Sequence, residues 1–370
     1  MTEPAPLQQI DRTYVRFRGR KLSYFSGCDY FRLSSRPGVI AALQAGARRF
    51  GLNVAASRLT TGNHALYGEL ERRLARFFGA PDALLVSSGY LTNLVVAQAL
   101  AGNFSHALLD DQSHPSLADA ARFLECPVLR FRHLDPDSVA ASVRRCGPGA
   151  SLLLLTDGMF SHNGSVAPLA AYLKALPRDG VMLVDDAHAA GVLGKRGRGS
   201  LEHDGVSRSR IIQTITLSKA FGAFGGAILG TAALRRRIID RSPMLIGSTP
   251  PPLPLANAAL RAVRILSSDK RLRFRLAHNA NYLKNALRAA GLLVADTPGP
   301  LVALVPERPQ QAARLKAALL AAGIFPPFIK YPGGPAQGYF RFVISSEHTR
   351  RQLDRLIRVL AKAAARFSPR

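Results

Sequence analysis

Between residues 80 and 230, short apolar runs alternate with stretches long enough to form a helix. The apolar runs have the length and composition of buried strands, and they cover residues 83–89, 106–111, 151–158, 181–188, 211–218 and 225–230. Strands separated by helix-length segments need crossover connections, and such connections give a mostly parallel sheet with helices on both faces. The pattern therefore predicts an α/β fold for this part of the chain.

Polar side chains follow most of these predicted strands. Those at or just beyond a strand end are Ser87, Asp110, Asp157, Asp185 and Lys219. Because the carboxyl ends of parallel strands meet at one edge of a sheet, ligands bind in the crevice outside that edge. We therefore expect the functional site at this edge.

The pattern changes after three consecutive prolines at residues 250–252. Long helical stretches follow, then a strand-like LLVADTPGPLVALVP, a helix near 309–323, the strand-like YFRFVIS and a terminal amphipathic helix. This order is typical of a separate α+β domain. We expect an N-terminal segment (1–50), a large domain (51–250) and a smaller C-terminal α+β domain (251–370).

The chain is strongly basic, with 50 Lys and Arg against 24 Asp and Glu and a formal net charge of +26. Such a charge attracts anions, including phosphates and acidic surfaces. A nucleic-acid-binding protein gathers its basic residues on one element, with aromatic residues between them. Here they are spread along the chain, so nucleic-acid binding is disfavoured and solvated helix faces are the simpler interpretation.

Location and metal content can also be predicted. No run of about 18 uncharged apolar residues is present, so we expect no membrane span. The N-terminus has no apolar signal core, which argues against export. Cys28, Cys126 and Cys146 form no C-x-x-C pair, which suits a reducing cytoplasm and argues against a thiolate metal site. We expect a cytoplasmic protein that holds no metal.

Lys219 follows a β-rich run in TITLSKAFGAFGG. A lysine beside a sheet end in an apolar setting can have a lowered pKa and act as an amine nucleophile. The neighbouring glycines would let a bulky ligand approach the backbone. A tolerated lysine at the sheet edge is the competing interpretation.

Asp185 ends four apolar residues in VMLVDDAHAAG, where a carboxylate is costly to bury without a cationic partner. A protonated pyridinium nitrogen would serve, and Asp185 would make it a better electron sink. A magnesium site is the alternative, because paired carboxylates also suit hard cations. His188 could hold Asp185 or a phenolic oxygen, or it could be a core histidine.

Three further features could complete such a site. His114, in LLDDQSHPSLADA, could stack on an aromatic ring, and Ser161, in TDGMFSHNG, could donate to a ring oxygen or cap its own turn. A phosphate would suit the strand-to-helix turn at residues 87–90, with Thr216 adding a hydroxyl group. The G-x-G-x-x-G, Walker, H-E-x-x-H and G-x-S-x-G patterns are absent.

Together these segments resemble the α-oxoamine synthases, pyridoxal-phosphate enzymes of fold type I. The resemblance runs from SRLTTGNHALYGELERRLARFFG (57–79) to ISSEHTRRQLDRLIRVL (344–360), with the motifs in order between them. It implies a mostly parallel, seven-stranded sheet with helices on both faces and a smaller α+β C-terminal domain. It also implies pyridoxal 5'-phosphate as the cofactor.

The resemblance implies a role for each residue. Lys219 is similar to the family's Schiff-base lysine and catalytic base, and Asp185 to its pyridinium partner. His114 matches the stacking histidine, while His188 and Ser161 match the ring-oxygen contacts.

The phosphate contacts are similar too. Ser88, Gly89, Tyr90 and Thr216 match the family's phosphate-binding positions. Thr249, before the proline run, matches a residue that reaches the phosphate of the neighbouring subunit, which implies a homodimer.

The implied reaction joins a small amino acid to an acyl thioester of CoA or a carrier protein, releasing CoA and commonly CO2. The DDAH sequence favours the branch that joins alanine to a pimeloyl thioester; a synthase with another acyl chain remains open. Further alternatives are an aminotransferase of the same fold and a non-catalytic protein that binds anions or nucleic acid.

Several residues depart from the family pattern. FSMDGD is FSHNGS here, and the usual preceding glutamate is Asp157. The family's carboxylate-binding arginine is replaced by Lys330 in FIKYPGGP, and lysine lacks the bidentate fork of arginine. Arg341 is basic and close in sequence, so Lys330 and Arg341 are the candidates for substrate binding.

Overall fold

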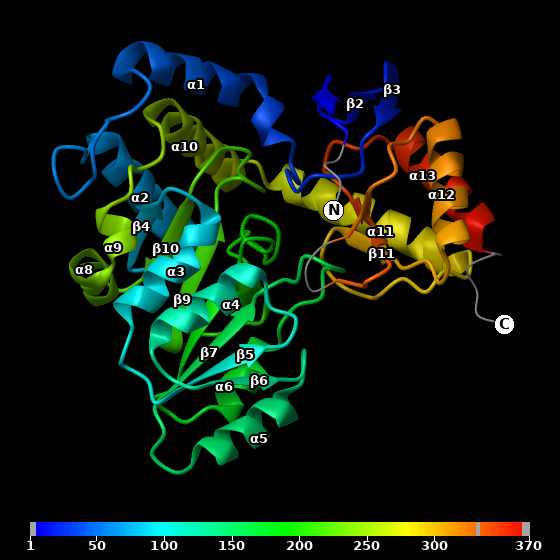
Figure 1. Cartoon of the computed structure of the whole chain (residues 1–370). Helices are drawn as coiled ribbons and strands as arrows, with labels where there is room; N and C mark the ends of the chain where they lie inside the picture. Colours follow the sequence, from blue (N-terminus) through cyan, green and yellow to red (C-terminus); the bar gives the residue numbers. More distant parts are fainter. Residues whose placement is uncertain (1–4, 331–333, 365–370) are drawn as a thin grey trace. The chain divides into compact units, whose positions relative to one another are not determined.

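The computed structural model describes residues 5–330 and 334–364 (Figure 1). Its contacts divide the chain into two units. Unit 1 consists of the described parts of Met1–Arg36, Ser161–Ser165 and Arg271–Arg370, and unit 2 consists of Pro37–Phe160 and Val166–Lys270. The sequence analysis placed the divisions at residues 50 and 250. The units change instead at 36 and 270, because helices α1 (Pro37–Phe50) and α10 (Leu253–Ser268) pack on each other within unit 2.

Unit 2 is built on a seven-stranded sheet with the strand order β4-β10-β9-β8-β7-β5-β6. The strands are β4 (Asp82–Val86), β5 (His106–Asp110), β6 (Val128–Phe131), β7 (Leu152–Asp157), β8 (Val181–Asp185), β9 (Ile211–Thr216) and β10 (Gly226–Gly230). Only β10 runs antiparallel to its neighbours. The predicted mostly parallel α/β sheet is confirmed. The edge strand β6 was not predicted, because only its last residue, Phe131, is buried.

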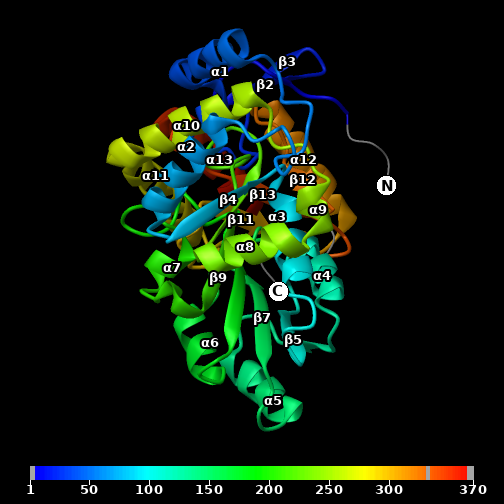
Figure 2. The same cartoon turned by 90° about the vertical axis from the view of Figure 1, so that its left-hand side faces the viewer.

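Alternate residues of β7 face opposite sides of this sheet. Leu153 and Leu155 join one buried cluster, and Leu152 and Leu154 join another. The helices α3 (Gly89–Ala99), α4 (Pro115–Ala121) and α8 (Ala232–Arg241) supply the first cluster, and α5 (Pro136–Cys146) and α6 (Leu169–Ala175) supply the second. Figure 2 shows α4 and α6 on opposite sides of β7. A strand buried on both faces is therefore almost wholly apolar.

Helix α2 (Ala65–Phe78) shows why such segments become helices. Its apolar residues recur every three to four positions, and its buried face includes Leu66, Leu70 and Leu74. The His64 side chain accepts from the Leu66 amide at the N-terminus, and Gly79 ends the helix in the left-handed region at φ 64°. The shorter helices of unit 2 are α7 (Ser200–His203), α9 (Pro243–Ile246), η2 (Arg122–Leu124) and η3 (Arg208–Arg210).

Unit 1 has its own core and the expected α+β character. One antiparallel sheet has the order β11-β13-β12, and another has the order β1-β2-β3. Its elements are β1 (Gln8–Gln9), β2 (Tyr14–Phe17), β3 (Arg20–Ser23), η1 (Leu33–Ser35), α11 (Lys270–Ala289), β11 (Leu301–Leu304), α12 (Pro309–Ala321), β12 (Phe328–Ile329), β13 (Tyr339–Val343) and α13 (Arg350–Ala364). The strand-like stretch before Leu301 does not form a strand. None of the helices in the described residues is long and apolar enough to cross a membrane.

Candidate active site

A cavity of about 250 Å³ lies in unit 2 at the carboxyl ends of the parallel strands. Its lining consists of Gly89, Tyr90, His114, Ser116, Asp157, Asp185, Ala187, His188, Thr216, Ser218 and Lys219. The structure thus brings most of the predicted site residues of unit 2 together. Asp110 lies elsewhere, because it is buried against His133, with 2.9 Å between its Oδ1 and the imidazole Nδ1.

Lys219 and His188 meet in this cavity. The Lys219 Nζ lies 2.8 Å from the His188 Nε2. The lysine belongs to a tight turn after β9, in which the Gly222 amide donates to the Lys219 carbonyl and Gly222 has φ 59°. This turn directs a partly buried amine at an imidazole within proton-transfer distance.

Asp185 is buried and held by two donors. Its Oδ2 accepts from the Asn93 side-chain amide at 2.7 Å, and its Oδ1 accepts from the Ala187 backbone amide at 2.9 Å. Asn93 is in turn fixed by the Thr214 hydroxyl, which donates to the Asn93 Oδ1 at 2.7 Å. These contacts orient the carboxylate that ends β8.

Asn93 was missed by the sequence analysis. It is fully buried on α3, and its side-chain amide donates to Asp185 and to the Ser116 hydroxyl oxygen. The available signal was an amide within the mostly apolar helix LTNLVVAQAL, because a buried amide needs a partner.

Asp186 has a different role from Asp185. Its carboxylate accepts from the Ser200 amide at 2.9 Å, from the Ser200 hydroxyl at 2.6 Å and from the Gln213 side chain. Burial raises the pKa of Asp186 to about 6. The two carboxylates have separate sets of partners, so the contacts do not favour the paired magnesium site that the sequence left open.

His114 is the N-cap of α4. Its Nδ1 accepts from the Ser116 amide at 3.2 Å and lies 2.7 Å from the Ser116 hydroxyl oxygen. Burial lowers the pKa of His114. The cap and the lowered pKa both favour a neutral imidazole, whose flat face can stack on an aromatic ring.

Asp157 ends β7 directly opposite Asp185 on β8. Its Oδ2 accepts from the His114 backbone amide at 2.7 Å. Burial raises the pKa of Asp157 well above its usual range, and the charge of Asp185 raises it further. Asp157 therefore lines the cavity as a carboxyl group whose protonated form is favoured by its surroundings.

The N-terminus of α3 lies against Thr216. Ser88 caps the helix, with its hydroxyl oxygen accepting from the Leu91 amide at 3.3 Å. A Cβ atom at Gly89 would lie 2.6 Å from the Thr216 Cβ, so only glycine allows this approach. Tyr90 lines the cavity, and its hydroxyl donates to Asp119. The first amides of a helix have no partners within it, so this end suits an anion.

Besides Ser87, Ser88 and Asp110, four more predicted residues are not part of this lining. Thr249 is exposed in unit 2. Lys330, Arg341 and Ser161 belong to unit 1, where Lys330 is exposed and the Arg341 Nη1 donates to the Ser161 carbonyl at 3.3 Å. Their predicted roles in binding cofactor or substrate remain predictions.

Comparison with known proteins identifies the family. The family model for aminotransferase class I and II matches residues 28–360. The 8-amino-7-oxononanoate synthase of Thioalkalivibrio sulfidiphilus is 36% identical, over 93% of this chain and 89% of its own length. The chain belongs to the aminotransferase class I and II family, among the α-oxoamine synthases.

Solved α-oxoamine synthases have the same fold. Serine palmitoyltransferase from S. paucimobilis, bound to a PLP–myriocin aldimine, has a TM-score of 0.92 and is 28% identical, over 99% of this chain and 94% of that one. The 8-amino-7-oxononanoate synthase from Francisella tularensis has a TM-score of 0.80 and is 26% identical, over 93% and 98% of the two chains. The predicted resemblance and the fold type I architecture are confirmed.

The cavity suits the pyridoxal phosphate found in that palmitoyltransferase. A buried carboxylate, a neutral imidazole and a lysine amine surround it, and Gly89 keeps the α3 N-terminus free of a side chain. These groups match a pyridine nitrogen, a ring face, an aldehyde and a phosphate, respectively. The volume of about 250 Å³ is near the lower end for ligand pockets, roughly 300–1,000 Å³, as a single-ring cofactor requires.

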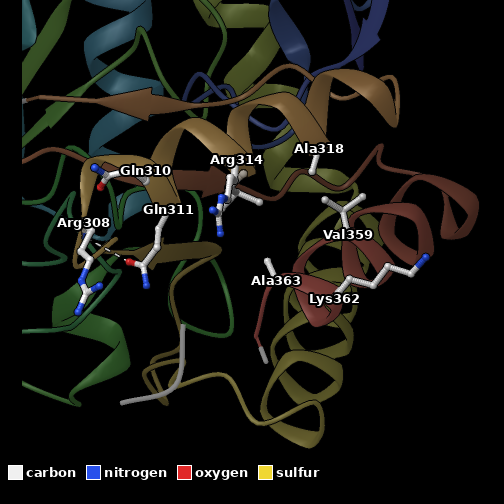
Figure 3. Close-up of a pocket in the computed structure, with 9 residues that line it drawn as sticks. Arg308, Gln310, Gln311, Arg314, Ala318, Val359, Lys362 and Ala363 are labelled. Carbon is white, nitrogen blue, oxygen red and sulfur yellow. Dashed lines mark hydrogen bonds between the residues drawn. The ribbon is translucent and has the colours of Figure 1, made fainter. Parts of the chain in front are cut away.

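A larger cavity of about 650 Å³ lies in unit 1 between α12 and α13 (Figure 3). Its lining consists of Arg308, Gln310, Gln311, Arg314, Leu315, Ala318, Val359, Lys362 and Ala363. In Figure 3 the Arg314 side chain points toward the opening, whereas the Lys362 side chain extends away from it. None of the site residues predicted from the sequence lines this cavity, so chemistry rather than size identifies the active site.

Proposed function

We propose that the chain condenses a small amino acid with an acyl thioester, releasing the thiol and CO2, with pyridoxal 5'-phosphate held at Lys219. The observation that carries this proposal is the placement of the Lys219 amine, 2.8 Å from His188, in the same cavity as Asp185 and His114. The membership of the α-oxoamine synthases supports it.

Each part of the cofactor has a partner among these residues. Lys219 would hold it covalently, Asp185 would pair with the ring nitrogen and His114 would cover one ring face. His188 and Ser161 would contact the phenolic oxygen. When bound, the cofactor supplies an electron sink for the carbanion formed at the amino-acid Cα.

The phosphate would lie at the N-terminus of α3. Gly89 and Tyr90 would offer backbone amides there, Ser88 would cap the helix and Thr216 would add its hydroxyl group. The positive end of the helix dipole favours the anion, and the closeness of Gly89 to Thr216 leaves no side chain between them.

The protein groups divide the proton transfers between them. Lys219 is the base that removes the Cα proton, and His188 is close enough to exchange a proton with its Nζ. Asn93 and the Ala187 amide donate to the Asp185 carboxylate and orient it in this part of the cavity. This carboxylate would pair with a protonated ring nitrogen.

The substrates we propose are alanine and a pimeloyl thioester, giving 8-amino-7-oxononanoate, a step of biotin synthesis. Support comes from the DDAH sequence and from relatives named for this activity. The donor is CoA or a carrier protein, and Lys330 and Arg341 are the proposed partners of the substrate carboxylates. We also propose that the enzyme works in the cytoplasm.

We further propose a homodimer in which Thr249 reaches the phosphate of the partner subunit. Large apolar side chains are exposed around this segment, including Leu52, which is 73% exposed, and Ile246. The segments lie close together, because the Leu253 amide donates to the Leu52 carbonyl and the Ser57 hydroxyl donates to the Ile246 carbonyl. An exposed apolar patch of this kind is typical of a subunit interface.

The dimer can be tested by sedimentation. We expect the wild-type chain to sediment as a dimer and Leu52→Asp to shift it toward the monomer with loss of bound cofactor. Phe274→Asp is the control, because Phe274 is 72% exposed in unit 1, away from Thr249 in the sequence. A wild-type monomer that binds cofactor fully would contradict the dimer.

The condensation is tested by release of free thiol from a panel of acyl-CoAs, with and without single amino acids. Release that requires one particular amino acid is expected, and Lys219→Ala should abolish both release and borohydride fixation of the cofactor. Keto-acid formation without thiol release would instead identify an aminotransferase. Salt-sensitive nucleic-acid binding that persists in Lys219→Ala, with no cofactor chromophore, would support a binding protein.

A further inference from the structure

Ser161–Ser165 is a five-residue segment whose contacts assign it to unit 1, although the chain on either side belongs to unit 2. Within unit 1 the Arg341 Nη1 donates to the Ser161 carbonyl at 3.3 Å, and the His162 ring lies 4.3 Å from the Tyr339 ring. Residues of unit 1 therefore hold the segment that carries Ser161 in place.

Lys284 lies on α11 at the centre of a second set of contacts. Its side chain is only 1% exposed. The Nζ donates to the Thr297 carbonyl at 2.7 Å, to the Thr297 hydroxyl oxygen at 2.9 Å and to the Gly299 carbonyl at 2.6 Å. All three hydrogens of an ammonium group are thus used, and each acceptor is neutral.

Keeping a cation at this position opposes folding. Burial lowers the pKa of Lys284 to about 8, and its neighbours on α11, Leu283 and Leu287, are core residues. An apolar side chain of similar length would fill the same space without this cost. The presence of an ammonium group here is therefore better explained by the segments that it holds in place than by a contribution to stability.

The Lys284 ammonium group orders the contact between the 297–299 loop and the Ser161–Ser165 segment. The Thr297 hydroxyl donates to the Asn163 carbonyl at 3.1 Å. A hydroxyl group has one proton, and Lys284 can only donate, so the ammonium group fixes the direction of this hydrogen bond. Gly164 also lies against Gly299, where a Cβ on Gly164 would be 3.1 Å from the Gly299 Cα.

We propose that Lys284 is a positioning residue, which fixes the Ser161–Ser165 segment through Thr297 and thereby sets the Ser161 hydroxyl for the cofactor's phenolic oxygen. The cofactor contact of Ser161 rests on the proposed function. We call the hydrogen bonds that run from Lys284 through Thr297 to Asn163 the clamp. The clamp itself rests on contacts within unit 1.

The clamp is tested first without cofactor, by hydrogen exchange of the backbone amides in residues 161–165. Lys284→Met and Thr297→Val should each speed this exchange by about tenfold, the effect of losing one hydrogen bond to a charged or buried group. Thr297→Ser keeps the hydroxyl group and is the matched control, so its exchange should match the wild type. Unchanged exchange in both Lys284→Met and Thr297→Val would overturn the clamp, and if Lys284→Met does not fold, Thr297→Val decides.

The purpose of the clamp is tested by cofactor affinity, measured by titrating the apoprotein with pyridoxal 5'-phosphate. We expect Lys284→Met and Thr297→Val to weaken binding about tenfold when Ser161 is present and less than about twofold in a Ser161→Ala background. Thr297→Ser should bind as the wild type does. An equal loss in both backgrounds would assign Lys284 a general structural role and overturn the positioning role.

The result of this affinity test can be distinguished from the result of the condensation assay. If the coupling to Ser161 is found but the wild type releases no thiol, the proposed reaction fails and the positioning role stands. If the wild type does not bind pyridoxal 5'-phosphate at all, the Ser161 contact and the proposed function both fail.

Discussion

Asp157 and Asp185 are directly opposite each other on neighbouring strands, yet their surroundings differ. Asp185 accepts from two donors, the Asn93 side chain and the Ala187 amide, and its charge opposes ionisation of Asp157. Burial is the larger cause of the raised pKa of Asp157. Different surroundings give two neighbouring carboxyl groups different roles. Here the Asp185 carboxylate is oriented for a pyridinium nitrogen, and the surroundings of Asp157 favour its protonated form.

This difference predicts opposite results for two matched substitutions. Asp185→Asn should keep the cofactor bound but lower kcat/KM for thiol release by about a thousandfold, because the charge opposite the ring nitrogen is lost. Asp157→Asn keeps the shape of a carboxyl group whose pKa is raised well above its usual range, so kcat/KM should stay within about fivefold of the wild type. Cofactor occupancy is measured by absorbance alongside the rate. Full activity in Asp185→Asn would exclude the electron-sink role.

At this scale the sequence revealed groups whose chemistry is unusual for their position. Lys219 and Asp185 could be predicted because charged residues directly after apolar strands need an explanation. Asn93 could not, because its partners Asp185 and Thr214 come from other elements. The grouping of Ser161 with unit 1 also depends on contacts made far along the chain.

Among the elements, the start of α3 is tightly constrained by its surroundings. It follows β4 and lies against the end of β9, and both strands run in the same direction because each is antiparallel to β10. The contact between Gly89 and Thr216 fixes this approach. Strands such as β7 and β8 were predictable because they are apolar throughout. The edge strand β6 was not, because its sequence is mostly exposed.

Gly89→Ala should therefore damage the site through backbone displacement. The added Cβ would lie 2.6 Å from the Thr216 Cβ, so α3 must move. We expect cofactor affinity to fall at least about tenfold and the free energy of unfolding to fall by about 1–3 kcal/mol. Titration with cofactor and urea unfolding measure the two effects.

Gly38→Ala in α1 is the control for this substitution. A Cβ there would meet only the end of the Arg261 side chain, at 3.6 Å. Alanine is the better helix former, so stability should stay the same or rise by up to about 1 kcal/mol with cofactor affinity unchanged. Equal losses in the two variants would show that the Thr216 contact is unimportant.

For the molecule as a whole, the excess of basic residues means that acidic pH adds charge to an already positive chain. His348 adds a specific sensitivity to acid. Its ring is stacked 4.1 Å from the Phe25 ring, and its Nδ1 accepts from the Ser345 amide. Burial, with a smaller effect of Arg32, lowers the pKa of His348 to about 3. The folded chain therefore holds a neutral imidazole where the unfolded chain would be protonated.

The sign of the pH dependence follows from proton uptake. Between about pH 3 and 6.5 the unfolded chain binds a proton at His348 that the folded chain does not, so stability falls as the pH falls. From pH 7 to pH 5 this residue should lower the free energy of unfolding by about 2 kcal/mol. The glutamine of His348→Gln cannot titrate. Between these pH values the free energy of unfolding of this variant, measured by urea unfolding, should therefore fall by about 2 kcal/mol less than that of the wild type. Parallel pH profiles for the two proteins would contradict this prediction.

The arrangement of unit 1 along the chain has a consequence for synthesis on the ribosome. Ser23 pairs with Ile324 in a parallel bridge, and the Ser23 amide donates to the Gly323 carbonyl at 2.8 Å. About 300 residues separate these partners, so at roughly 5–20 residues per second the N-terminal segment waits about 15–60 seconds for them. During that interval Leu22 and Phe25, buried in the finished protein, have no core to enter. The nascent chain therefore keeps these two apolar side chains without their final partners until the residues near 324 have been translated.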